Sequence, residues 1–166
     1  MRRVKAAIAM LAVMSLGATG TGRERELQSL PVCEKPRLVS TTDWIRLSQG
    51  DGFVLQLPPC FQPDTEAPRY VHGGKRWRCE TATVEVVWGM WGAGSFGERE
   101  ACRSVLGAVP VLVARKTKES GLGVLVWYLT GGIHEPMISA FGGTDADVLT
   151  TIAHSGRLTV ARGPNR

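Results

Sequence analysis

The sequence predicts an α+β protein, in which an antiparallel sheet of about six to seven strands carries one or two helices packed on it. Short apolar segments alternate with polar residues, Gly-rich or Pro-rich turns separate these segments, and only two segments carry helix-capping signals. Of the 166 residues, 43% are hydrophobic and 21% are charged, a balance typical of a folded chain with one core. The composition excludes a disordered tail, a collagen-like repeat and a coiled coil.

The first twenty residues have the three parts of a secretory signal peptide. Residues 1–5 are basic, residues 6–16 are apolar, and residues 17–20 supply the small side chains that a signal peptidase requires. The apolar run is shorter than the roughly 20 residues that a membrane-spanning helix needs. We therefore expect cleavage after Gly20, export to the periplasm or the extracellular space, and no membrane span in the mature chain.

The charge pattern argues against nucleic acid as a partner. The formal net charge is +5, but Arg2, Arg3 and Lys5 belong to the signal peptide, which leaves 17 basic against 15 acidic residues, or +2. The remaining basic residues are scattered and form no stripe that would follow a phosphate backbone. We expect the partner to be a protein or a small ligand, still unknown.

Four cysteines, Cys33, Cys60, Cys79 and Cys102, follow the signal peptide. An even number of cysteines in an oxidising compartment predicts two disulfides. Four cysteines allow three connectivities, and proximity along the chain favours Cys60 with Cys79, which leaves Cys33 with Cys102. The sequence has no Cys-x-x-Cys pair and no His at ligand spacing from a Cys, so we expect neither a metal site nor a cofactor.

The mature chain divides into an extended arm at residues 21–42, a single domain at residues 43–160 and a tail at residues 161–166. The arm has mixed charges, two prolines and little periodicity. We expect it to be held to the domain through Cys33.

The domain begins with two predicted hairpins. Residues 43–47 and 53–57 flank a Gly-Asp-Gly turn, and residues 70–72 and 75–79 flank a Gly-Gly turn. Between the hairpins, residues 62–68 read as a polar loop bounded by prolines. Alternation within each strand predicts one face toward the core and one toward water.

Four further strands are predicted. Residues 82–88 alternate, and residues 109–114 and 122–129 are apolar on both faces, which is typical of the centre of a covered sheet. Residues 136–141 predict a last strand that is shorter and closer to an edge.

Two segments predict helices. Ser95 followed by Glu98 has the spacing of a capping box and predicts a short helix that ends at Leu106, before a glycine. A second helix is predicted to begin after Thr144, whose hydroxyl caps the N-terminus, and to end at Gly156.

A set of motifs along the domain resembles that of a known family. The set comprises Trp44, the Gly-Phe-x-Leu-x-Leu-Pro-Pro-x-Phe motif at residues 52–61, a strand that ends in Trp88 and Gly, and a closing helix with Ile152-Ala-x-Ser. It resembles a group of uncharacterised exported bacterial proteins and the Mog1/PsbP-like fold, an antiparallel sheet sandwiched between helices. Cys60 departs from the pattern, which usually carries Gly there. The resemblance implies fold and compartment and carries over no functional residue.

One candidate catalytic pair is Ser95 with His154. The segment around Ser95 approximates a G-x-S-x-G nucleophile elbow, and Asp145 or Asp147 followed by His154 has the chain order of an α/β-hydrolase triad. However, Ala93 replaces the first glycine, hairpins do not predict the parallel sheet of that fold, and Asp147 lies about 10 Å from His154 along one helix. We interpret Ser95 as a helix N-cap and keep a small serine hydrolase as the alternative.

The candidate binding residues are Trp91, Phe96, Arg76 and His72. Aromatic rings interleaved with glycines after Trp88 suit a platform for a sugar or a peptide, but tryptophans more often belong to a core, so the preferred interpretation is that these rings pack back onto the sheet. Alternation places Trp88 toward the core and Trp91 away from it. Arg76 belongs to a strand whose basic residues form either a solvated face or an anion-binding edge. The function we predict is a non-catalytic binding or envelope-assembly module.

Overall fold

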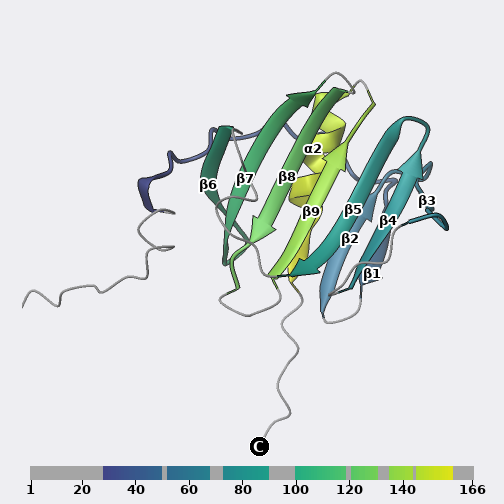
Figure 1. Ribbon diagram of the computed structural model, residues 1–166, viewed down its shortest axis with the longest axis horizontal. Coiled ribbons are helices and arrows are strands. Elements are labelled where there is room, and N and C mark those ends of the chain that lie inside the picture. Colours follow the sequence, from purple (N-terminus) through teal and green to yellow (C-terminus); the bar gives the residue numbers. More distant parts are fainter. Residues whose placement is uncertain are drawn as a thin grey trace, which may run out of the picture.

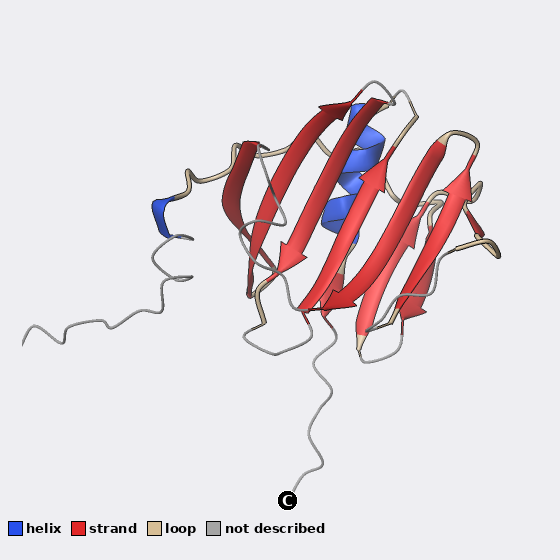
Figure 2. Ribbon diagram, in the orientation of Figure 1, coloured by secondary structure: helices blue, strands red, loops and turns tan. Residues whose placement is uncertain are grey.

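The computed structural model confirms the α+β class and shows two layers. It describes residues 28–49, 52–67, 73–89, 100–118, 121–130, 135–143 and 145–158. Within these ranges the chain forms ten strands and the helix α2. Seven strands make one large antiparallel sheet, and a small sheet of three strands lies with α2 on one face of it (Figures 1 and 2). The small sheet is an addition to the single sheet that the sequence predicted.

The large sheet has the strand order β3-β4-β5-β9-β8-β7-β6. Its strands are β3 (Gln62–Pro63), β4 (Gly74–Cys79), β5 (Ala82–Gly89), β6 (Glu100–Leu106), β7 (Val109–Lys118), β8 (Gly121–Tyr128) and β9 (Glu135–Phe141). At its centre, Ile138 of β9 pairs with Val86 of β5 on one side and with Val126 of β8 on the other. All three side chains are fully buried, so β-branched residues form the middle of the core.

The second layer covers the core from the other side. The small sheet has the order β1-β2-β10, with β1 (Ile45–Gln49), β2 (Phe53–Leu57) and β10 (Arg157–Leu158), and α2 spans Ala146–Ser155. The inward side chains of β2 and α2 pack against the large sheet; they are Phe53, Leu55, Leu57, Leu149, Ile152 and Ala153. The predicted hairpin at residues 43–57 is therefore confirmed, with its first strand beginning at Ile45.

The predicted helix that ends at Leu106 is wrong at residues 100–106, which form strand β6. β6 pairs with β7 along its whole length, from Glu100 opposite Arg115 to Leu106 opposite Val109. The glycine after this segment, Gly107, has a φ of 66°. A glycine with positive φ serves a hairpin turn as well as a helix C-terminus, so this signal did not distinguish the two structures.

The strand β9 lies at the centre of the large sheet, and the predicted place near an edge is wrong. Among the strands of the large sheet, β9 is the last along the chain, yet it inserts between β5 and β8. It begins with Glu135 and then Pro136, which cannot donate a backbone hydrogen bond. The pairing with β8 begins only at Met137, opposite Trp127, so the proline lies beyond that ladder.

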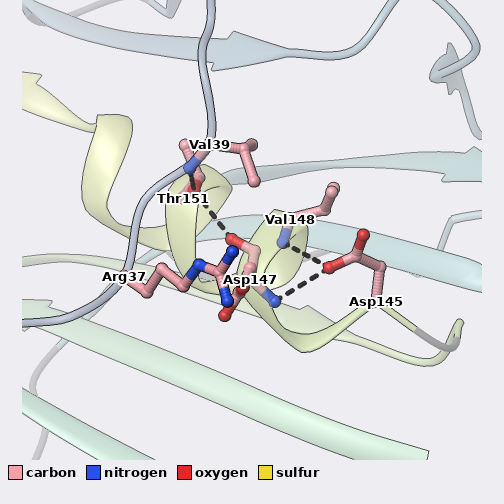
Figure 3. Close-up of polar contacts among 6 residues, drawn as sticks. All are labelled: Arg37, Val39, Asp145, Asp147, Val148 and Thr151. Atoms are coloured by element: carbon pink, nitrogen blue, oxygen red, sulfur yellow. Dashed lines mark hydrogen bonds and ion pairs between the residues drawn. The ribbon is translucent and has the colours of Figure 1, made fainter.

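The helix α2 begins one residue later than predicted. Its N-cap is Asp145, whose Oδ1 accepts hydrogen bonds from the backbone N–H groups of Asp147 and Val148, at 3.0 Å each (Figure 3). Thr144, the predicted cap, lies outside the described residues. With ten residues, α2 is too short to cross a membrane, and the described part of the chain has no helix that is long and apolar enough to do so.

Gly156 follows α2 as predicted, but for a different reason than expected. Its φ is −57°, which any residue adopts, so no left-handed conformation is involved. A Cβ at this position would collide with the Tyr128 hydroxyl and would lie 2.5 Å from Ile138 Cδ1 and 2.8 Å from Phe53 Cζ. Close packing of the chain against the core therefore requires glycine here.

Candidate ligand-binding cleft

The predicted arm is attached to the edge of the large sheet at β6. The disulfide Cys33–Cys102 joins the arm to this strand with a Cα–Cα distance of 4.9 Å. Beside it, the Cys33 N–H donates to the Arg103 carbonyl at 2.9 Å, and the Arg103 N–H donates to the Pro31 carbonyl at 2.8 Å. These bonds form a short parallel bridge that covers part of the β6 edge.

Farther along, the arm is attached to α2. The Val39 N–H donates to Thr151 Oγ1 at 2.9 Å, and the Thr151 hydroxyl in turn donates to the Asp147 carbonyl at 2.7 Å (Figure 3). Arg37 Nε lies 3.4 Å from Asp147 Oδ2. The arm thus spans the space between β6 and the helix, with a fixed attachment on each.

A cleft of about 710 Å³ lies between the arm, the β6 side of the large sheet and α2. Residues 31–37 of the arm line one side of it. The helix contributes Asp147, Thr150 and His154, whose spacing of three and then four residues places them on one helix face. The volume lies within the range of small-molecule sites.

The large sheet contributes two opposite charges to the cleft. Glu100 on β6 and Arg115 on β7 are cross-strand neighbours and both line it. Arg115 follows Val113 by two positions, so it lies on the sheet face that carries the buried core. Within the described residues, no ion pair of either side chain is present. Arg115 therefore offers a guanidinium whose donors are available to a ligand.

His154 and Thr150 are buried polar side chains of the cleft. His154 lies in the last turn of α2 with 5% of its surface exposed, and its Nε2 has no hydrogen-bond partner among the described residues. Burial, helped by the positive charges of Arg115 and Arg157, lowers the pKa of His154 from 6.5 to about 4. The imidazole is therefore neutral at pH 7.

The two arginines near His154 differ in their hydrogen bonding. Arg157 Nη1 donates to the carbonyls of His154 and Gly156 at 2.7 Å each, so this guanidinium caps the end of α2. In the part of the chain that the structure describes, no carboxylate accepts a hydrogen bond from His154, and Asp147 is paired with Arg37 instead. The arrangement is a neutral imidazole beside an available guanidinium, which suits binding.

Four predicted site residues lie outside the described residues: Ser95, Trp91, Phe96 and His72. Their roles stay predictions. Trp88, predicted to face the core, does so: its ring packs edge to face against Phe53, with ring centroids 6.2 Å apart.

Arg76 lies on β4, far from the cleft along the strand order. Its Nη2 is 2.6 Å from Glu85 Oε1 and its Nη1 is 3.5 Å from Asp64 Oδ2, while Arg78 Nε is 2.9 Å from the same Asp64 oxygen. Trp77 between the two arginines is buried, as alternation predicts. The two carboxylates neutralise much of the charge that an anion-binding edge would need, and Arg76 is not brought together with His154.

The second disulfide, Cys60–Cys79, joins the segment after β2 to the end of β4, with a Cα–Cα distance of 5.4 Å. Both disulfides have the pairing that proximity along the chain favoured. They are consistent with an oxidising environment. Across the described ranges, no three His, Cys, Asp or Glu side chains gather as metal ligands.

Sequence reasoning missed Arg115 and Glu100. The strand predicted at residues 109–114 stops one residue before Arg115, whereas β7 continues to Lys118. Alternation was the signal that could have found Arg115. Val111 and Val113 face the core, so two residues further on Arg115 is a charged residue on the inward face. Glu100 was hidden by the incorrect helix.

No family model matches the chain, and no curated protein matches it in sequence.

Proposed function

We propose that this chain is an exported, non-catalytic module that binds a small ligand in the cleft between the arm and α2. One observation carries the proposal: His154 lines a cleft of about 710 Å³, is 5% exposed, and has a buried Nε2 to which no residue that the structure describes forms a hydrogen bond. A buried polar atom left unpaired costs about 1–3 kcal/mol, so a ligand that pairs with it gains that free energy.

Export is supported by two independent features. The first twenty residues have the pattern of a signal peptide, and the chain that follows carries two disulfides. The resemblance to exported bacterial proteins with a Mog1/PsbP-like fold points to the same compartment. In this proposal, any role of the protein in the cell envelope depends on its binding of this ligand.

The test is a thermal-shift screen of the disulfide-bonded mature protein against a defined set of sugars, amino acids, carboxylic acids and phosphate esters. The variant Ala146→Trp places a large ring at an exposed position that lines the cleft. Its matched control is Thr65→Trp, at an exposed position just after β3, the strand at the opposite edge of the large sheet from β6. We expect at least one compound to raise the melting temperature of the parent and of Thr65→Trp, and this rise to be lost in Ala146→Trp.

Two results would overturn the proposal. The first is that no compound binds, or that every hit binds equally to Ala146→Trp. The second is hydrolysis of a model ester that Ser95→Ala abolishes, which would favour the serine hydrolase.

A further inference from the structure

We infer that the ligand of this cleft carries an anionic oxygen group, a carboxylate or a phosphate, that binds between the guanidinium of Arg115 and Nε2 of His154. This inference rests on the proposed function and adds the chemical class of the ligand. Both side chains line the same cleft, Arg115 from β7 and His154 from α2. An anionic oxygen accepts from both groups, which no neutral or cationic group does as well.

Hydrogen-bond donors of Arg115 and His154 are available in the cleft. Arg115 makes no ion pair with any described residue, although Glu100 is its cross-strand neighbour. Nε2 of His154 is buried and has no hydrogen-bond partner in the described ranges. Five fixed N–H donors on the guanidinium and one on the imidazole thus meet at one cleft, and a carboxylate or phosphate group can accept from both at once.

Charged groups from several elements surround His154. The positive charges of Arg115 on β7 and Arg157 after α2 both act to lower the pKa of His154. Arg157 already donates to two carbonyls at the end of α2, so Arg115 remains as the cation for a ligand. On its own helix, Asp147 is held by Arg37 of the arm.

The cleft also contains ionisable groups that lie on the arm and on β6. The arm also presents Glu34 and Lys35, which are adjacent in sequence, and β6 presents Glu100. Neither acid is among the groups that act on the pKa of His154. The inner part of the cleft, at His154, is therefore the electropositive part, and an anionic group is complementary to it.

A bound anion would also change the protonation of His154. The negative charge favours the imidazolium, so the pKa of His154 rises on binding, and by linkage the anion binds more tightly as the pH falls. Binding is then coupled to the uptake of a proton. A site built only from Arg115 would show no such pH dependence.

The experiment uses sulfate as the probe, because its charge does not change over the pH range used. Binding to the full mature protein is followed by NMR of the His154 ring and by calorimetry at constant ionic strength. We expect affinity to rise about tenfold between about pH 7.5 and about pH 5, and the rise to be absent in His154→Gln. Arg115→Gln should weaken sulfate binding about tenfold, while the matched control Arg46→Gln, an exposed arginine on β1, should leave it unchanged.

Further probes distinguish the possible sources of the anion, and they distinguish failure of this inference from failure of the proposed function. Succinate and inorganic phosphate distinguish a carboxylate ligand from a phosphate ligand, glucose is the neutral probe and spermidine the cationic probe. The inference is overturned if Arg115→Gln binds sulfate like the parent, or if glucose or spermidine, but no anion, shifts the His154 signals. In that second case the cleft still binds a ligand and the proposed function stands, whereas a cleft that no probe or screened compound enters ends both.

Discussion

The helix α2 packs on the large sheet, and its two flanks differ. The flank toward β2 is tightly packed and is called the closed side here, whereas the flank toward the arm borders the cleft and is called the open side. Toward β2, Ser155 Oγ accepts from the Gln56 N–H at 3.0 Å and also lies within hydrogen-bond distance, 3.1 Å, of the Gln56 carbonyl. Just beyond, Gly156 leaves no room for a Cβ. Toward the arm, the same helix faces a cleft of about 710 Å³.

The difference lies in what each neighbour brings to α2. β2 is a regular strand, so every second side chain points inward, and Phe53, Leu55 and Leu57 fill the space. The arm has no such periodicity and is held at two places, by Cys33 on β6 and by Val39 on α2. An extended segment fixed only at its ends spans a gap without filling it, which explains why the cleft lies on this side.

The largest expected effect concerns the disulfide that holds the arm. Its two cysteines are 69 residues apart, against 19 for Cys60–Cys79. The chain-entropy relation gives about 4 kcal/mol for the longer loop and about 3 kcal/mol for the shorter one. The double variant Cys33→Ser/Cys102→Ser should therefore lose more free energy of unfolding in urea than Cys60→Ser/Cys79→Ser.

This variant also tests whether the arm closes the cleft. Without the disulfide, the Val39 N–H that donates to Thr151 should exchange with solvent faster. The Gln56 N–H on the other side of α2 should keep its protection, because Ser155 still pairs with it. Equal loss of protection at both amides would contradict the comparison of the two sides.

The second effect is a pH dependence of stability that comes from the open side. The pKa of His154 is lowered from 6.5 to about 4 in the folded chain, so between these values the unfolded chain binds more protons. Stability is therefore full above about pH 6.5 and decreases as the pH falls to about 4, by up to about 3 kcal/mol. Urea unfolding across this range measures it, and His154→Gln should flatten the curve. A curve that is equally steep in this variant would assign the dependence to other groups.

The third effect concerns the closed side. Gly156→Ala places a methyl group against Tyr128, Ile138 and Phe53, and overpacking of this kind costs about 2 kcal/mol. Ala146→Val on the same helix adds volume at an exposed position beside the cleft and should change stability by less than about 0.5 kcal/mol. Thermal unfolding compares the two, and a similar loss in both would show that the open side has no spare room.

The closed side was easier to predict from the sequence than the open side, for a physical reason. The β1–β2 hairpin and α2 carry local signals: a Gly-rich turn and alternation for the hairpin, and polar capping residues before the apolar positions of the helix. The central place of β9 and the cleft depend on contacts between segments far apart in the chain. Arg115 becomes a site residue because the arm, attached at Cys33, lines the same cleft, and no local sequence pattern predicts that placement.

The smallest expected effect concerns the N-cap, which both sides of α2 share. The sequence predicted Thr144 as the cap, whereas Asp145 accepts the hydrogen bonds of Asp147 and Val148. Asp145→Ala should lower the free energy of unfolding by about 1 kcal/mol, and Asp145→Asn, which keeps an accepting oxygen, should restore most of it. Thr144→Ala should change stability little.

Because Leu149 and Ile152 fix the helix against the sheet, loss of the cap frays only its first turn. That turn carries Asp147, which holds Arg37 of the arm, so faster amide exchange in Asp145→Ala should reach Val39 and should not reach Gln56. Exchange that accelerates equally at Gln56 would mean that α2 responds as one unit and that its two sides are not independent.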